Sequence, residues 1–445
     1  MKTDKFLLVS PPYETVGVTE SVSSASVTLS IAMLAGQCRQ AGREVELLDL
    51  NVNPHWREAF ESAIARMRPD IVGITFATPL EKVSIELARI AREMGCATIG
   101  GGPHASAMPA ECVGRDAFDA VVMGEGEVPF QHLLDTGEVD CPGWVTSRTL
   151  IPQASEPWPD MDTLPLAAVD LFTPDDYQYP ARACKANPVC LIETSRGCYA
   201  RCTFCNKNIF GWKIRKKSAE RVVDEMEYIL NSGYHEIHIA DDLFSAHYHH
   251  VRAVCTEIKR RGLDFPWVPR SGLRVDRVKP DMLDQMREAG CYHIPFGIES
   301  GDQSTLDLIN KGITIAQIEH AAKIAKDAGM QTTGYFMVGI PGESNVAMQH
   351  TLEFALSLEL DFVKIGICVP LPGTPMFQMA KQQGLLKTTD WSRYTYSTPS
   401  WEILSAEEVQ EDRMRELTVA GHSLLDVANK TLVKDIAGEY SVARD

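Results

Sequence analysis

Three closely spaced cysteines form the group of side chains best suited to metal chemistry: Cys198, Cys202 and Cys205. Thiolates hold iron–sulfur clusters, and a cubane cluster usually takes four of them. A loop that offers three thiolates therefore leaves one iron open to bind another molecule. A zinc site is the alternative, and it would need a fourth ligand from elsewhere, such as His235 or His238.

The elements expected to position this loop are strands that alternate with helices. We expect strands at residues 189–194, 236–240, 267–273, 293–298, 332–338 and 362–369. Helical patterns lie between them, for example at residues 220–230 and 317–328. Six strand–helix units predict a partial or complete parallel barrel of the TIM type, whose reactive groups lie at the carboxyl ends of the strands. The cysteine loop follows the first of these strands and is expected at that end.

A second α/β region precedes the barrel. Apolar runs at residues 6–10, 45–49, 71–75, 97–100 and 120–123 alternate with helical patterns such as residues 81–94. Continuous apolar runs separated by helices predict a doubly wound, Rossmann-like sheet that binds its ligand at the carboxyl ends of the strands. The residues expected at or just beyond those ends are Pro12, Thr75, Gly101, Gly102, Pro103, His104, Gly124, Glu125, Gly126 and Glu127.

These patterns divide the chain into four segments. The doubly wound domain covers residues 1–135, and a proline-rich linker without clear periodicity covers residues 136–185. The barrel covers residues 186–385, and a charged, helical region follows at residues 386–445, in which residues 406–428 have the clearest helical pattern.

Composition and charge exclude several classes of protein. Hydrophobic residues make up 44% of the 445 residues and charged residues 23%, which is an ordinary globular balance. With 60 acidic and 43 basic residues the net charge is −17, so a general nucleic-acid binder is not expected. No apolar run is long enough to span a bilayer, and the N-terminus lacks the apolar core of a signal peptide. We therefore expect a cytoplasmic protein.

The cysteine loop resembles that of the radical S-adenosylmethionine (SAM) superfamily, whose signature is CxxxCxΦC with an aromatic residue, here Phe204, at Φ. Residues 297–301, Gly-Ile-Glu-Ser-Gly, resemble the family's fourth-strand motif near the ribose and amino group of SAM. Residues 338–343 resemble the fifth-strand glycine motif near the adenine, and residues 370–375 resemble the turn after the sixth strand. The resemblance implies a [4Fe-4S] cluster on the three cysteines. It also implies SAM-binding roles for Phe204, Glu299, Ser300, Val338 and Gly339.

Two further residues have suggested roles beside SAM. Asp241-Asp242 stands after the second barrel strand, where many relatives have Gly-Gly-Glu, and this departure suggests a SAM- or substrate-facing role for Asp241 or Asp242. Arg274 ends the third predicted strand, and its guanidinium is suited to a bidentate pair with the SAM carboxylate.

The N-terminal sheet resembles the cobalamin-binding domain that precedes many radical SAM barrels. Small residues such as Gly101 and Gly102 would let a bulky corrin approach the backbone. The DxHxxG motif that supplies a histidine to cobalt in some such domains is absent, since Asp49 is followed by Leu-Asn-Val-Asn. The resemblance therefore implies cobalamin without a lower histidine ligand. For His104 three roles stay open: lower ligand, contact with the nucleotide tail, or cap of its turn.

The function that these resemblances imply is cobalamin-dependent methyl transfer by a radical SAM enzyme. SAM would be cleaved to a 5′-deoxyadenosyl radical, and cobalamin would deliver a methyl group to an unactivated carbon of a small-molecule or lipid substrate. An electron donor such as flavodoxin or ferredoxin would reduce the cluster.

Three alternative hypotheses remain beside this one. Radical cyclisation or rearrangement without methyl transfer is not separated from it by any motif. Methylthiolation of tRNA would use a second cluster on three N-terminal cysteines, here Cys38, Cys96 and Cys112. It is disfavoured, because residues 386–445 hold no basic cluster and because Cys38 and Cys96 lie in predicted helices. A non-catalytic cobalamin or redox sensor would not need the SAM motifs.

Overall fold

The computed structural model describes residues 1–13, 26–149, 151–155, 158–181, 183–395 and 425–426. The chain divides into two compact units. The first comprises Met1–Ile192, Asn206–Ile237 and Asp390–Arg393, and the second comprises Glu193–Cys205, His238–Thr389 and the described part of Tyr394–Asp445.

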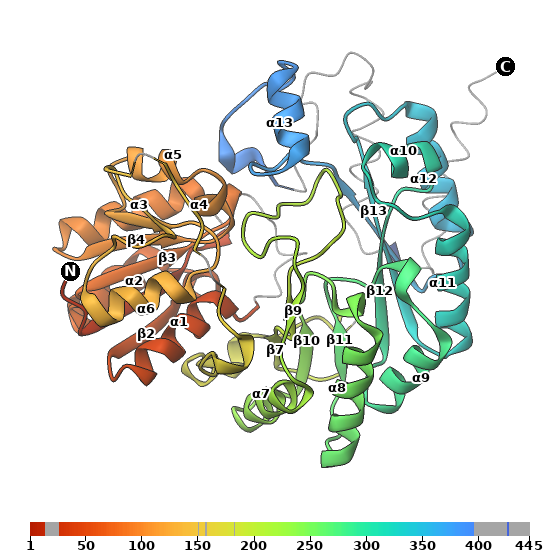
Figure 1. The fold of residues 1–445 in the computed structure, drawn as a ribbon, viewed down its shortest axis with the longest axis horizontal. Coiled ribbons are helices and arrows are strands. Elements are labelled where there is room, and N and C mark those ends of the chain that lie inside the picture. The colour runs from red at the N-terminus through yellow and green to blue at the C-terminus, as the bar shows by residue number, and fades with distance from the viewer. Residues whose placement is uncertain (14–25, 150, 156–157, 182, 396–424, 427–445) are drawn as a thin grey trace. The chain divides into compact units, whose positions relative to one another are not determined.

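The first unit is built on a six-stranded sheet of order β2-β1-β3-β4-β5-β6, with helices on its faces (Figure 1). Its strands are β1 (Lys5–Ser10), β2 (Glu44–Asp49), β3 (Ile71–Thr75), β4 (Ala97–Gly101), β5 (Ala120–Val122) and β6 (Trp144–Val145). Its helices are α1 (Leu29–Gln40), α2 (Trp56–Met67), α3 (Glu81–Glu93), α4 (Pro103–Ala107), α5 (Pro109–Gly114) and α6 (Glu127–Thr136). Strands β1 to β5 pair in parallel, so the predicted doubly wound fold is confirmed.

The apolar runs fold as buried strands because both faces of the sheet are covered. Phe6, Leu7, Leu8 and Val9 of β1 are each no more than 1% exposed. Strand β6 pairs antiparallel with β5 and was not expected, because it is two residues long and lies in the proline-rich segment. The segment boundaries drawn from the sequence stay a prediction.

The barrel strands alternate with helices as expected. They are β7 (Val189–Ile192), β10 (Glu236–Ile239), β11 (Trp267–Pro269), β12 (His293–Glu299), β13 (Gln331–Val338) and β14 (Phe362–Ile367). The helices are α7 (Ala219–Asn231), α8 (Tyr248–Arg261), α9 (Pro280–Glu288), α10 (Gln303–Leu308), α11 (Ile315–Asp327), α12 (Asn345–Ser357) and α13 (Pro375–Gln382). Two sheets result, of order β11-β10-β7 and β12-β13-β14-β15, where β15 is Leu425–Asp426, so the partial barrel is confirmed.

Two expectations for the barrel region need correction. The strand expected at residues 267–273 ends at Pro269, and a turn at Gly272, whose φ is +88°, leaves only an isolated bridge from Leu273 to Phe296. The helix expected at residues 406–428 is wrong at Leu425–Asp426, which form β15 antiparallel to β14. The rest of that range lies outside the described residues.

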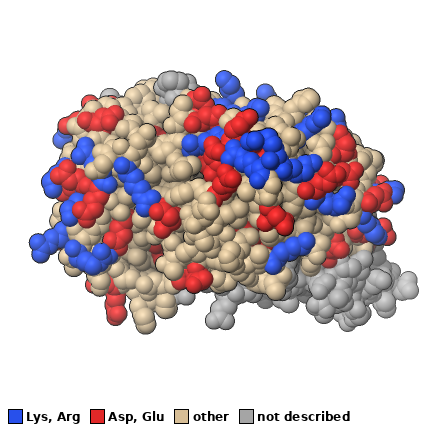
Figure 2. Space-filling view, turned by 90° about the horizontal axis from the view of Figure 1, so that it is seen from below, with Lys and Arg blue, Asp and Glu red and all other residues tan. Residues whose placement is uncertain are grey.

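The surface mixes both signs of charge. Figure 2 shows basic and acidic side chains interspersed over one face, although acidic residues are in excess over the whole chain. In the part of the chain that the structure describes, no helix is both long enough and apolar enough to cross a bilayer.

Candidate functional site

The cysteine loop is held from two sides within the second unit. The Thr203 amide donates to the carbonyl of Ile309 at 2.9 Å, and the Met376 amide donates to the carbonyl of Thr203 at 2.9 Å. Cys198 and Cys202 are buried, and Cys205 is half-buried. All three are free thiols, so the donors that a cluster needs are present and in one loop.

Within the described residues, no three His, Cys, Asp or Glu side chains converge as the ligands of a single metal ion. A cubane sets a different requirement, since each thiolate binds a separate iron. The cysteines of the methylthiolation alternative are also buried. Cys38 lies on α1 and Cys112 on α5, whereas Cys96 lies between α3 and β4 and not in a helix as expected.

Two neighbouring carboxylates hold the chain that enters the cysteine loop. Asp241 accepts hydrogen bonds at 2.6 Å from the Thr194 amide, the Thr194 hydroxyl and the Ser195 hydroxyl. Asp242 accepts from the Gly197 amide at 3.0 Å. Asp241 is 2% exposed, and burial raises its pKa to about 6. The structure thus gives Asp241 partners in the protein itself, at the base of the loop.

A cation that sequence reasoning missed lies beside the loop. Lys311 pairs with Glu299 at 2.7 Å, and its ammonium lies 5.8 Å from the centre of the Phe204 ring. Glu299 ends β12 with φ at +73°, a conformation that non-glycine residues rarely adopt. Burial raises the pKa of Cys202, while the charges of Lys311 and Arg274 oppose that rise. Lys311 lies in no sequence motif. Its place at the end of β12 depends on the turn after α10, which the sequence analysis did not predict.

Arg274 is occupied by protein partners. Its Nε donates to Asp276 at 2.9 Å, and its two terminal nitrogens donate to the carbonyls of Lys311 and Gly312 at 3.0 and 3.3 Å. These contacts fix the backbone that presents Lys311. The role of Arg274 toward a SAM carboxylate stays a prediction.

The remaining predicted SAM residues support turns at the strand ends. The amides of Gly339 and Ile340 donate to Glu343, whose pKa burial raises to about 7. The Ser300 hydroxyl lies 2.9 Å from that of Thr351 and is fully buried. Val338 is 1% exposed at the end of β13. Their roles toward SAM stay predictions.

The two neighbouring glycines at the end of β4 differ in the space around them. Gly102 has φ at +98°, and a Cβ there would lie 2.8 Å from the Phe76 carbonyl oxygen, so the protein's own packing requires this glycine. At Gly101 a Cβ would meet no atom within 4 Å. The space that a corrin would need therefore fits Gly101 better than Gly102. Half-buried Thr75 lies nearby in register, paired with Gly101 across β3 and β4.

His104 is fully buried on α4 beside Pro103. Its Nδ1 lies 3.2 Å from the Thr78 hydroxyl, and its ring centre lies 5.5 Å from that of Trp391. Among the residues that the structure describes its Nε2 has no hydrogen-bond partner, and burial lowers the pKa of the imidazole to about 4. The imidazole is therefore neutral and enclosed by protein. This arrangement favours a packing role for His104 over that of a cobalt ligand.

The glycine-rich turn after β5 contains an ion pair that the sequence did not reveal. Glu125, 4% exposed, forms a two-pronged pair with the Arg215 guanidinium, which lies 4.6 Å from the centre of the Trp158 ring. The Gly124 amide donates to Ser106 at 3.1 Å, and buried Glu127 starts α6 one residue after Gly126. Pro12 follows β1 and is buried. Glu125 thus shapes the turn through Arg215.

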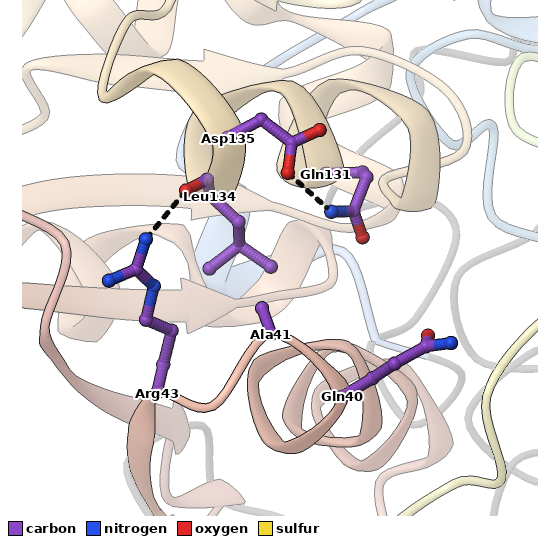
Figure 3. A pocket seen from close by; sticks show the side chains of 6 residues that line it. All are labelled: Gln40, Ala41, Arg43, Gln131, Leu134 and Asp135. Carbon is purple, nitrogen blue, oxygen red and sulfur yellow. Dashed lines mark hydrogen bonds between the residues drawn. The ribbon is translucent and has the colours of Figure 1, made fainter.

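A hollow of about 470 Å³ in the first unit lies away from these strand ends (Figure 3). It is bounded by the end of α1, the start of β2 and α6, and the Arg43 guanidinium donates there to the Leu134 carbonyl at 3.1 Å. No predicted site residue lines it. The strand ends therefore remain the candidate site of this unit.

Comparison with protein families identifies both halves of the chain. The radical SAM superfamily matches residues 192–355, and the B12 binding domain matches residues 15–134. The first match contains the cysteine loop, and the second contains the strand ends of the first unit, apart from Pro12.

The chain is similar to curated proteins along most of its length. An uncharacterized methyltransferase of Pyrococcus horikoshii is 31% identical, covering 98% of this chain and 95% of that protein. The cytidylyl-2-hydroxyethylphosphonate methyltransferase of Streptomyces wedmorensis is 28% identical over 80% of this chain and 78% of its own. The anaerobic magnesium-protoporphyrin IX monomethyl ester cyclase of Rubrivivax gelatinosus is 27% identical, with coverages of 83% and 68%.

Solved structures share the fold. The radical SAM methyltransferase TsrM from Kitasatospora setae, with cobalamin and a [4Fe-4S] cluster bound, has a TM-score of 0.70 at 20% identity, covering 87% of this chain and 80% of its own. OxsB with aqua-cobalamin bound has a TM-score of 0.75 at 17% identity, with coverages of 94% and 66%. The order of a doubly wound domain followed by a partial barrel is thus an observed architecture.

Proposed function

Since this chain belongs to the radical SAM family whose members carry an N-terminal B12-binding domain, we propose that it is a cobalamin-dependent methyltransferase of a small-molecule substrate. The family's cofactors are a [4Fe-4S] cluster, SAM and cobalamin. The observation that carries the proposal is the presence on one chain of the cysteine loop with its free thiols and of the open strand end at Gly101.

The cofactors, when bound, supply a 5′-deoxyadenosyl radical from SAM and a methyl group from cobalamin, and the chain supplies their positioning. Cys198, Cys202 and Cys205 would hold the cluster. Lys311 and Glu299 present one cation and one carboxylate beside Phe204, where the amino and carboxylate groups of SAM need partners of opposite charge. A reduced flavodoxin or ferredoxin is the proposed source of the electron.

The cluster assignment is tested by Cys198→Ala, Cys202→Ala and Cys205→Ala. Each variant should lose the brown chromophore and the cleavage of SAM, because each thiolate binds one iron. Cys141→Ala is the matched control, since Cys141 is a half-buried cysteine of the first unit and should keep both. Full iron content in any of the three loop variants would contradict the assignment.

The cobalamin assignment is tested by Gly101→Leu. The added side chain meets no protein atom at its Cβ, so the fold should persist while cobalamin affinity falls at least tenfold. The measurement is retention of hydroxocobalamin by the purified protein, with iron content as the control. Unchanged retention would place the corrin elsewhere.

Methyl transfer is tested by mass spectrometry of products formed with isotope-labelled SAM methyl. The second candidate, radical cyclisation without methyl transfer, is favoured by the similarity to the cyclase of Rubrivivax gelatinosus. Label in the product supports the first function, and an unlabelled product of altered mass supports the second.

A further inference from the structure

One aromatic side chain of the cysteine loop is exposed. Tyr199 directly follows Cys198 and is 37% exposed. The Arg277 guanidinium lies 5.1 Å from the centre of the Tyr199 ring, and the Arg277 side chain is 46% exposed. Both residues belong to the second unit. Because the Cα atoms of Cys198 and Tyr199 are about 3.8 Å apart across one peptide bond, a molecule that contacts this ring stands next to a predicted cluster ligand.

The pair of Tyr199 and Arg277 is held in place from the protein interior. Arg277 ends η9 (Val275–Arg277), and its Nε lies 3.4 Å from one carboxylate oxygen of Asp276. The other carboxylate oxygen of Asp276 accepts from the Nε of buried Arg274 at 2.9 Å. A side chain that is already fixed loses less conformational entropy when a partner binds. The pair is therefore prepared for contact with another molecule.

This part of the surface is positive, although the chain as a whole is acidic. Asp276 is one carboxylate between two guanidiniums, so the three groups together carry one positive charge. The Asp276 side chain is 15% exposed, so the more exposed Arg277 guanidinium is the group that a visiting molecule meets. The net charge of −17 disfavours the approach of another acidic protein to the chain as a whole. A positive group beside the cysteine loop gives such a protein a place at which attraction replaces repulsion.

We propose that Tyr199 and Arg277 form the docking point of an acidic protein that delivers one electron to the cluster. The inference rests on the proposed function, because only the cluster needs such an electron. One electron leaves the carrier protein and enters the cluster, and no bond forms or breaks. Tyrosine and arginine suit a docking point, because a rigid ring and a planar guanidinium offer a large contact area and several donors.

Binding is the first test. Calorimetry measures the affinity of an acidic flavodoxin for the reconstituted holoenzyme. Arg277→Gln removes the charge, and Arg287→Gln is the matched control, because Arg287 is 51% exposed and lies 3.7 Å from Asp284 near the far end of α9. Flavodoxin should bind about fivefold more weakly to Arg277→Gln and with unchanged affinity to Arg287→Gln. Arg277→Lys, which keeps the charge, should restore the affinity, and added salt should weaken binding to the unaltered protein.

The rate of cluster reduction is the second test, and it separates docking from the chemistry of the cluster. Stopped-flow absorbance follows the reduction by flavodoxin and by reduced methyl viologen, a small cation that a guanidinium does not attract. In Arg277→Gln the reduction by flavodoxin should slow about fivefold, whereas the reduction by methyl viologen should not slow. Iron content shows that the variant has kept its cluster.

The outcomes separate this docking point from the proposed function. No binding of flavodoxin to the unaltered protein, or equal affinities in Arg277→Gln and Arg287→Gln, would overturn the docking point even if SAM cleavage is intact. A loss of SAM affinity in Arg277→Gln as large as the loss of flavodoxin affinity would assign the guanidinium to SAM and overturn it as well. A cluster that methyl viologen does not reduce in the unaltered protein would overturn the proposed function, and the electron-delivering role with it. Weaker binding and slower reduction confined to Arg277→Gln, with recovery in Arg277→Lys, support the proposal.

Discussion

Two buried carboxylates, one in each unit, stand beside the strand ends that carry the candidate cofactor sites, and they are held in opposite ways. Glu125 in the first unit pairs with the Arg215 guanidinium, itself packed on Trp158. Asp241 in the second unit accepts hydrogen bonds from the Thr194 amide and from the hydroxyls of Thr194 and Ser195. A cation balances the first charge, whereas among the described residues the second is held by hydrogen-bond donors without a cation, and burial raises its pKa to about 6.

The difference predicts different responses to loss of charge. An ion pair that loses one member leaves the other buried and unbalanced, which costs more than the pair itself contributes. A carboxylate held by dipoles can be neutralised in place, because hydroxyls both donate and accept. The stability of the turn after β5 should therefore depend on the charge of Glu125. The stability of the chain that enters the cysteine loop should depend on hydrogen bonds to Asp241 and not on its charge.

The largest effect is expected for Glu125→Gln. The Arg215 side chain, which is only 13% exposed, would lose its carboxylate partner. The first unit should therefore lose about 3–5 kcal/mol of stability. Chemical denaturation followed by circular dichroism measures the change. Asp327→Asn, which breaks the solvent-exposed pair with Lys323, should leave the stability nearly unchanged. Equal costs in the two variants would contradict the contrast.

A smaller, pH-dependent effect is expected for Asp241→Asn. The folded-state pKa of about 6 lies above the ordinary aspartate value of 3.8, so the folded state holds this proton more tightly. Its stabilisation is present below pH 4 and is lost as the pH rises through 6. The difference in unfolding free energy between Asp241→Asn and the unaltered protein should change by about 2 kcal/mol from pH 4 to pH 7, in favour of the variant. If the unfolding free energies of the two proteins changed in parallel with pH, the ionisation of Asp241 would not destabilise the folded state, and the raised pKa would be contradicted.

The residues of this comparison show what the sequence could predict. The doubly wound sheet, the barrel strands and the cysteine loop follow from apolar periodicity and spacing, which are local. Glu125 and Asp241 were both predicted as site residues, because each follows a predicted strand. Their partners Arg215 and Thr194 were not predicted, because pairing depends on which side chains the fold brings together. Gly101 and Gly102 could not be distinguished from the sequence. In the structure a Cβ at Gly102 would collide with the backbone of Phe76, whereas a Cβ at Gly101 would meet no atom.

The same limit explains why Lys311 was not predicted. It lies in no motif, and a lysine in a sequence is most often a solvated surface residue. The turn after α10 places Lys311 beside Glu299 and the Phe204 ring of the cysteine loop. This position is a consequence of topology, which periodicity alone does not supply.

The smallest effect is expected for Thr194→Val, which removes one hydroxyl donor from Asp241 and keeps the side-chain shape. The Thr194 amide and the Ser195 hydroxyl remain, so the loss should be about 1.5–3 kcal/mol at pH 7, where the carboxylate is charged. At pH 4 the protonated carboxyl needs fewer donors, and the loss should shrink. Denaturation at the two pH values measures this, with Thr351→Val as a control for a buried hydroxyl that contacts Ser300 and no carboxylate. A loss independent of pH in both variants would mean that the Thr194 hydroxyl stabilises the loop through packing, and Asp241 would then be held chiefly by Ser195.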